Sequence, residues 1–446
     1  MLALYRSFDE IRVFLFVWIG QFVSLIGSRL TAFGLNIWIY QQTGSVTEFG
    51  LLILCGSLPG LLLSPVTGVF VDRWSRRWTM IIADSYVGLC TLTIAWLFAT
   101  DHLSIWALYG ITALSSCFEA FQSTAYISAT TLLVPKDQLI RASGLTRLAR
   151  AVAKIIAPVV AGLLLEAIQL QGIILIDFAT LVVALIPLLL LRFPEVRDDG
   201  ELAQPQPFFE AVVYGWQYLI ARPGLLGLMI FLAASNVVIG AFSVLSTPLI
   251  LSLTSPTGLG TVLSISSCGL VVGSLLMSIW KSEEHQIIKT LFRCMVAAGL
   301  FILVSGLRPS IYLFAIADFF LSIMFPIITG LVQVIFQTKV APDVQGRVFS
   351  IQEPLATAGI TLGYAIAGPL DELVFEPLMT SDWFLANTIV EMIGFGPGHG
   401  IALLNMVMGG LLVIATLCVY QYPRLQRLED EIPDQTTVTV ELSASS

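Results

Sequence analysis

The segment GVFVDRWSRR, residues 68–77, separates two long apolar runs with one acid and three arginines. The runs on either side, residues 46–70 and 77–100, each exceed the roughly 20 residues that a helix needs to cross the hydrocarbon core of a bilayer. The segment therefore predicts a tight turn at a membrane surface between two spanning helices.

The composition of the whole chain agrees with this interpretation. Of 446 residues, 57% are hydrophobic and 12% are charged, whereas soluble domains contain about 45–50% apolar and about 25% charged residues. The pattern predicts an all-α membrane protein with twelve transmembrane helices. We expect them at residues 13–40, 46–70, 77–100, 104–133, 141–167, 172–192, 223–251, 257–280, 286–306, 311–338, 347–371 and 400–421.

A polar, proline-bearing stretch after residue 192 divides these helices into two sets of six. Within it, FFEAVVYGWQYLIARP (208–223) is too polar to span and is typical of an amphipathic helix lying at the membrane interface. The predicted organisation is an N-terminal bundle (1–192), a cytoplasmic linker containing the amphipathic helix (193–222), a C-terminal bundle (223–421) and a disordered cytoplasmic tail (422–446).

Basic residues favour the cytoplasmic side of a membrane protein. If the N-terminus is cytoplasmic, the outside loops hold one base, Arg308, and the long segment after residue 371 holds acids alone. The inside segments then hold Arg6, Arg12, Arg73, Arg76, Arg77, Lys136, Arg141, Arg192, Arg197, Arg222, Lys281, Lys339, Arg347, Arg424 and Arg427. Both termini are therefore predicted to be cytoplasmic.

The two halves have similar sequences at corresponding loops, which is typical of transporters built from internal repeats. TLLVPKDQLIRASG (131–144) closes the fourth predicted helix, and FQTKVAPDVQGRVFS (336–350) closes the tenth. Each places a proline, then an aspartate, a glutamine and an arginine before the next helix. Duplication is the preferred explanation, and chance similarity of two short loops is the alternative.

The segment 68–77 resembles the signature loop of the major facilitator superfamily, with Ser75 where glycine is usual. The resemblance implies a major facilitator fold of two pseudo-symmetric six-helix bundles. It also implies a gate, in which Asp72 binds the N-terminus of the helix at 347–371 and the arginines form further bridges. Gly68 is expected to permit a close helix approach, and the alternative is an ordinary basic cytoplasmic loop. The predicted gating residues are Gly68, Asp72, Arg73, Arg76 and Arg77.

Two further features resemble the branch of this family that contains enterobactin exporters and macrolide-efflux proteins. Helix 141–167 carries small residues around Pro158, similar to the pattern of antiporters, although routine helix packing is the alternative. The first helix and VPKDQLIRASGL (134–145) extend the resemblance over nearly the whole chain. That branch often has an acid after the glycine of the first helix, whereas Ser28 and Arg29 follow Gly27 here.

Ionisable residues inside apolar spans cost about 2.5–3.5 kcal/mol each on insertion scales, so each is a functional candidate. Arg29 lies about 16 residues into its helix, or roughly 24 Å of rise, and Glu119 is similarly central. Lys154 shares a helix face with Arg147 and Arg150. The candidates for the substrate path or for ion coupling are Arg29, Glu119, Lys154 and Asp318, with Glu119 the first choice for a proton site. Asp84, Asp177 and Glu353 are predicted to form contacts between helices or at the surface.

These features predict a secondary-active transporter of the inner membrane. It is expected to be a proton-coupled exporter of small amphipathic compounds, such as a drug or siderophore, that works by alternating access as a monomer. Metabolite uptake or lysolipid transport on the same fold is one alternative, and a non-transporting receptor or assembly factor is another. No enzyme motif, nucleotide-binding loop or metal spacing is present, so no catalytic residue, cofactor or nucleic-acid partner is expected.

Overall fold

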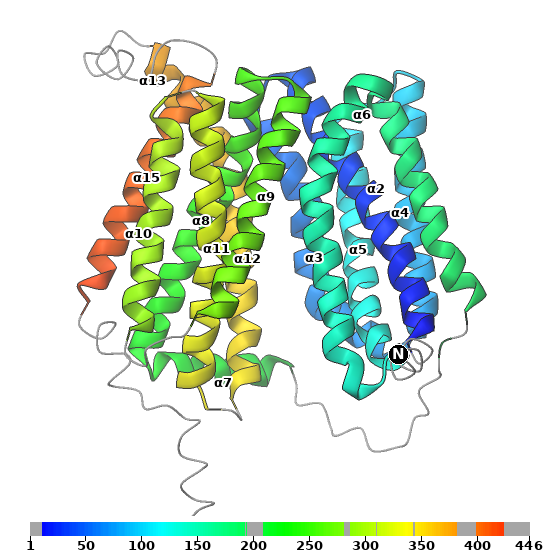
Figure 1. Ribbon diagram of the computed structural model, residues 1–446, viewed down its shortest axis with the longest axis horizontal. Helices are drawn as coiled ribbons and strands as arrows, with labels where there is room; N and C mark the ends of the chain where they lie inside the picture. The colour runs from blue at the N-terminus through cyan, green and yellow to red at the C-terminus, as the bar shows by residue number, and fades with distance from the viewer. Residues whose placement is uncertain are drawn as a thin grey trace, which may run out of the picture. The chain divides into compact units, whose positions relative to one another are not determined.

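The computed structural model describes residues 11–191, 193, 208–280, 286–308, 310–341, 344–380 and 398–422. These residues are nearly all helical, and no β-strand occurs among them (Figure 1). The chain forms two compact units. Unit 1 comprises Met1–Asp198 and Thr254–Ser264, and unit 2 comprises Asp199–Leu253 and Ile265–Ser446.

Unit 1 begins with long helices joined by short turns. They are α2 (Arg12–Thr43), α3 (Val46–Arg73), α4 (Arg76–Ala99), α5 (Ile105–Leu133) and α6 (Leu139–Leu190), with the 3-10 turn η1 (Lys136–Gln138) before α6. Gln169 has a left-handed backbone inside α6 (φ 57°). This residue divides α6 into two helical segments, which correspond to the predicted helices at 141–167 and 172–192.

Unit 2 contains a short helix and a second series of long ones. They are α7 (Phe208–Ile220), α8 (Pro223–Leu253), α9 (Pro256–Ile279), α10 (Ile287–Gly306), α11 (Ile311–Lys339), α12 (Gln345–Leu370), the π-helical turn η2 (Asp371–Phe375), α13 (Glu376–Thr380) and α15 (His399–Tyr420). The first residues of α9 belong to unit 1. Sequence reasoning left 372–380 without structure, whereas η2 and α13 occupy them.

Nine helices among the described residues are long and apolar enough to cross a membrane. One of the nine is the run Lys136–Leu190, which Gln169 divides into two. The equally long α5 and α12 carry more polar residues along their length. With these, the described residues hold twelve helical segments of membrane-spanning length, and the predicted all-α membrane fold is confirmed.

Glycines mark where the helices of each unit pack closely. Along α2, Gly20, Gly27 and Gly34 face Ala184, Asp177 and Leu170 of α6 in turn, so α2 runs antiparallel to the second segment of α6. In unit 2, α10 and α15 are likewise antiparallel, and α8 packs extensively on α12. Small residues at such contacts let helix backbones approach closely where lipid supplies no hydrophobic driving force.

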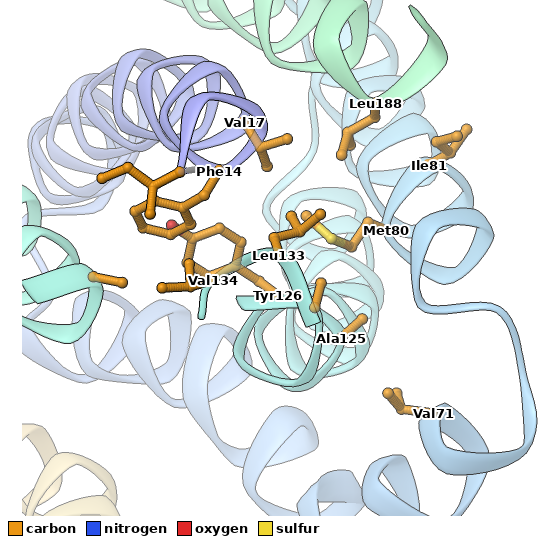
Figure 2. Packing of buried hydrophobic residues seen from close by; sticks show 13 residues of the cluster. Phe14, Val17, Val71, Met80, Ile81, Ala125, Tyr126, Leu133, Val134 and Leu188 are labelled. Carbon is orange, nitrogen blue, oxygen red and sulfur yellow. The ribbon is translucent and has the colours of Figure 1, made fainter. Parts of the chain in front are cut away.

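A cluster of buried side chains closes one end of unit 1 (Figure 2). Phe14 and Val17 of α2 meet Met80 of α4, Tyr126 of α5 and Leu188 of α6, and all five are less than 9% exposed. This cluster fixes the helix ends next to the segment 68–77. It thereby provides a rigid base for the arginines of that segment.

The remaining predictions for the chain ends and linker differ in outcome. The segment 208–220 is helical as expected. Arg6, Arg192, Arg197, Lys281, Arg424 and Arg427, most of the linker and nearly all of the C-terminal tail lie outside the described residues.

Candidate functional site

A group of polar side chains lies in the middle of unit 1, on helices that are otherwise apolar. Helix α5 contributes Glu119 and Gln122, α2 contributes Gln21 and Arg29, and α4 and α6 contribute one aspartate each. Polar groups at membrane depth are costly and generally face a protein interior or a water-filled cavity. These residues therefore form the candidate site.

Arg29 and Glu119, 90 positions apart in the sequence, lie within electrostatic range of each other in the fold. The charge of Arg29 acts on the Glu119 carboxylate, and the Ser115 hydroxyl donates a hydrogen bond to it. Both Arg29 and Glu119 are exposed although each lies in the middle of its helix. An opposite charge nearby favours the ionised carboxylate, so a change in the position of Arg29 would alter how strongly Glu119 holds a proton.

A chain of amides links three helices to Asp84. Gln122 Nε2 donates to Gln21 Oε1 at 2.7 Å, and Gln21 Nε2 donates to Asp84 Oδ2 at 3.0 Å. Asp84 is 8% exposed, and Glu119 lies within electrostatic range of it. The amide chain fixes the position of the Asp84 carboxylate and connects it to α5, the helix that carries Glu119.

Asp177 brings a third carboxylate to the same interior. The Ser28 hydroxyl donates to Asp177 Oδ1 at 3.2 Å, and Asp177 acts electrostatically on Glu119. A Cβ at Gly27 would lie 3.0 Å from Asp177 Cα, so glycine is required where α2 passes this residue. Ser28, which follows the first-helix glycine, thus binds an acid of α6.

The predicted contacts of Asp84 and Asp177 between helices are confirmed, because Gln21 and Ser28 of α2 bind them. Glu353 is exposed on α12. Among the described residues, the buried carboxylates of Asp84 and Asp177 lie within electrostatic range of Glu119. Neighbouring negative charges favour the binding of a proton. The sequence analysis missed Gln21 and Gln122. An uncharged polar side chain in the middle of an apolar run is the sequence feature that could have indicated them.

The arginines of the segment 68–77 bind other parts of unit 1. Arg76 Nε donates to Ser128 Oγ on α5 at 2.9 Å. Arg77 Nε and Nη2 donate to the carbonyl oxygens of Leu188 and Leu189 at 2.6 and 2.7 Å. These carbonyls belong to the last turn of α6, which lacks helical partners and carries partial negative charge. Arg76 and Arg77 thus fasten the turn to α5 and α6.

The other predicted gating residues are placed differently. Arg73 is exposed at the end of α3. No described atom lies within 4 Å of the position that a Cβ at Gly68 would take. The close helix approach expected there is therefore absent among the described residues. The side chain of Asp72 lies outside the described part of the chain.

The small residues around Pro158 pack tightly, as their spacing predicts. Ala153, Ala157 and Ala161 are buried, and a Cβ at Gly162 would lie 2.8 Å from the carbonyl oxygen of Pro256, in the part of α9 that belongs to unit 1. The role of this contact in antiport stays a prediction. Lys154 is exposed, as are Arg147 and Arg150 on the same helix face.

Asp318 lies apart from these groups, in unit 2. It is 9% exposed and accepts a hydrogen bond from Ser266 Oγ at 2.6 Å. This bond joins α9 to α11. Asp318 therefore contributes to a packed helix contact, and the described polar cluster of unit 1 does not include it.

The fold and the sequence identify the class of protein. The family model of the Major Facilitator Superfamily matches residues 17–364. The chain belongs to this superfamily of membrane transporters, which are not enzymes.

Individual relatives agree with this assignment. The chain is 26% identical to macrolide efflux protein A of Streptococcus pyogenes over 383 residues, which cover 83% of this chain and 91% of the relative. It is 23% identical to the enterobactin exporter EntS of Salmonella typhimurium over 368 residues, which cover 80% and 85%. The crystal structure of a bacterial homologue of the human lysosomal transporter Spinster matches with a TM-score of 0.69 at 16% identity, covering 94% and 98%.

Proposed function

We propose that this membrane transporter is a proton-coupled exporter of small amphipathic compounds. The electrostatic interaction of Arg29 with Glu119 in the middle of unit 1 carries the proposal. Glu119 binds the coupling proton, and Arg29 tunes its affinity by moving toward or away from the carboxylate. Asp84 and Asp177 complete an interior in which adding a proton relieves repulsion between negative charges.

The direction and substrate class are supported by the names of two relatives, a macrolide efflux protein and an enterobactin exporter. Identities of 26% and 23% support export as a shared activity, whereas the individual substrate depends on a few side chains that differ between relatives. An amphipathic drug or siderophore is the proposed cargo. Lys154 and Asp318 stay candidates for the substrate path.

The proposed cycle is alternating access, in which the transporter exposes a central site to each side of the membrane in turn. The segment 68–77 acts as its gate. Arg76 and Arg77 hold the turn in place, and Asp72 forms the contact that opens and closes. Asp72→Asn is therefore expected to cripple transport, whereas a passive receptor would tolerate it.

The proposed setting is the inner membrane, with both termini in the cytoplasm and the protein working as a monomer. For the N-terminal bundle, the predicted orientation rests on the arginines at residues 73, 76 and 77, which lie at one end of unit 1. Cysteine accessibility from each side of intact cells tests it, and labelling of an introduced Ser75→Cys from the outside would overturn it.

Transport in proteoliposomes with an imposed pH gradient tests proton coupling. A fluorescent amphipathic dye serves as the probe, and its accumulation should follow the gradient and collapse with a protonophore. Glu119→Gln should lose gradient-driven accumulation because a neutral amide cannot exchange a proton. Glu166→Gln, the same change at an exposed position of α6, is the matched control.

The outcomes separate the alternatives. Dye flux that ignores the pH gradient would remove the coupling claim, and a Glu119→Gln variant that transports like the control would remove the role of Glu119. Accumulation in the opposite direction would favour uptake. The absence of movement of any dye, drug or lysolipid would favour a receptor or assembly factor.

A further inference from the structure

One end of unit 2 carries a second group of acids, separate from the interior of unit 1. Helix α12 contacts α7 near its own start, where Gly215 packs on Arg347. At its other end α12 continues into η2 and α13, which lie at the end of the unit away from α7 (Figure 1). The start of α15 packs against both η2 and α13.

Asp371, the first residue of η2, is buried without a complete set of hydrogen bonds. It is 3% exposed, and its Oδ1 has no hydrogen-bond partner among the residues that the structure describes. Buried polar atoms are nearly always paired, so each exception needs a physical explanation. π-Helical turns such as η2 are rare and occur frequently at functional sites.

A glycine brings a second carboxylate to Asp371. Asp371 Oδ1 lies 2.9 Å, and Glu376 Oε2 2.5 Å, from the point that a Cβ at Gly400 would occupy. Both oxygens therefore lie close to the same glycine, Gly400, in the first turn of α15. Two ionised carboxylates this close repel each other, and one proton between them removes the repulsion.

Within the described part of the chain, η2 and α13 carry no basic side chain, and the base of α12, Arg347, lies at the α7 end. The N-terminus of α15 favours negative charge near Asp371, but its effect corresponds to about half an elementary charge. The titratable and charged groups on the elements packed at this end are Glu372 of η2, Glu376 of α13, His399 of α15 and Arg308, which follows α10.

We propose that Asp371 and Glu376 form a proton-binding site, in which buried Asp371 carries the proton and exposed Glu376 exchanges it with water. In the binding step a hydrated proton joins one oxygen of the Asp371 carboxylate and gives a neutral carboxylic acid. No other bond changes. The inference rests on the proposed function only for its use in transport, where this site would take up the coupling proton from the side of the membrane opposite α7.

The electrostatics support the same assignment. Burial, followed by the negative charges of Glu376 and Glu372, raises the pKa of Asp371 to about 7. Since the folded protein holds this proton more tightly than the unfolded chain, the site stabilises the fold at low pH. That stability is lost as the pH rises through about 7.

Thermal unfolding of the purified full-length protein across a range of pH tests proton binding without any substrate. The Tm of the wild type should fall as the pH rises through about 7, and Asp371→Asn should flatten this fall. Asp101→Asn is the matched control, because Asp101 is exposed and its φ of 56° suits asparagine. Profiles of the wild type and Asp371→Asn that differ by a constant offset would overturn the proposal.

Infrared difference spectra provide a second measurement, on a variant that keeps Asp371. The wild type should show a protonated carboxyl band that disappears near pH 7. Glu376→Gln removes a neighbouring negative charge, so it should move this loss to lower pH. An unmoved midpoint would overturn the assignment of the site to this pair.

Failure of this inference is distinguishable from failure of the proposed function. A pH gradient that drives dye transport together with unaltered titration in Asp371→Asn would remove this site and leave proton coupling intact. Titration lost in Asp371→Asn together with gradient-independent transport would establish the proton site and remove its coupling role.

Discussion

The first long helix of each unit is used differently. In unit 1, α2 presents Gln21, Ser28 and Arg29 to partners on α4, α5 and α6. In unit 2, α8 carries no charged residue, and its Gly240 packs on the backbone of Ile360 in α12. These two helices occupy corresponding positions. Helix α2 forms polar contacts in unit 1, whereas α8 forms a close backbone contact in unit 2.

The difference between α2 and α8 indicates which parts of a fold built from two similar halves serve function. Repeats preserve helix order and packing pairs, because both are needed to bury each bundle. Buried ionisable groups are costly and are retained where they act. Of these two helices, α2 is therefore the one that carries charge into the membrane interior, whereas α8 is used for close packing.

The greatest predicted change is a loss of stability when close packing in unit 2 is disturbed. Gly240→Ala should lower the stability by up to about 3 kcal/mol, because its Cβ would collide with the Ile360 carbonyl and overpacking a tight contact costs about 1–3 kcal/mol. Thermal unfolding in detergent measures the change. Gly227→Ala on the same helix is the control, since no described atom lies within 4 Å of its Cβ position. Equal Tm values would show that α8 does not depend on close packing.

The next effect concerns the charge network of unit 1. Asp84→Asn should lower gradient-driven dye efflux about tenfold, equivalent to roughly 1.4 kcal/mol, because asparagine keeps the size but cannot hold a negative charge. Glu353→Gln in unit 2 should stay within about twofold, since Glu353 is exposed on α12. Initial rates in proteoliposomes compare the two. Equal losses would contradict a functional division between the units.

The smallest expected effect concerns the contact between α7 and the corner before α12. The backbone N–H of Ala341 donates to Tyr218 Oη at 3.2 Å. Tyr218→Phe removes this acceptor and should lower the stability by about 0.5–1.5 kcal/mol. Tyr312→Phe is the control, because Tyr312 is 78% exposed. Chemical denaturation measures both, and an unchanged Tyr218→Phe variant would mean that α7 is held by its apolar contacts alone.

Much of the fold could be predicted because hydrophobic length is a local property. The expected helix at 311–338 corresponds to Ile311–Lys339, and that at 400–421 corresponds to His399–Tyr420. The break inside α6 was predicted because a polar stretch separates two apolar runs, and Gln169 lies in it. The turn η2 was missed, since a π-helix differs from an α-helix by hydrogen-bond register and has no composition of its own.

The candidate site was predictable only in part. Arg29 and Glu119 were singled out because a charge in an apolar run is costly wherever it lies. Gln21 and Gln122 were missed because an uncharged amide raises a weaker signal. Lys154 shares that signal with Arg29 and Glu119, and its place on the substrate path stays a prediction.

The membrane environment, the helix order and the family could be predicted from the amino-acid sequence, because the length of apolar runs and the spacing in GVFVDRWSRR are local properties of the chain. Only the tertiary structure decided that Gln21 joins Asp84 to Gln122, that Arg77 binds the end of α6, and that Gly400 brings Asp371 and Glu376 together. Periodicity assigns a residue to a face of its own helix. Which neighbouring helix meets that face depends on how whole helices pack.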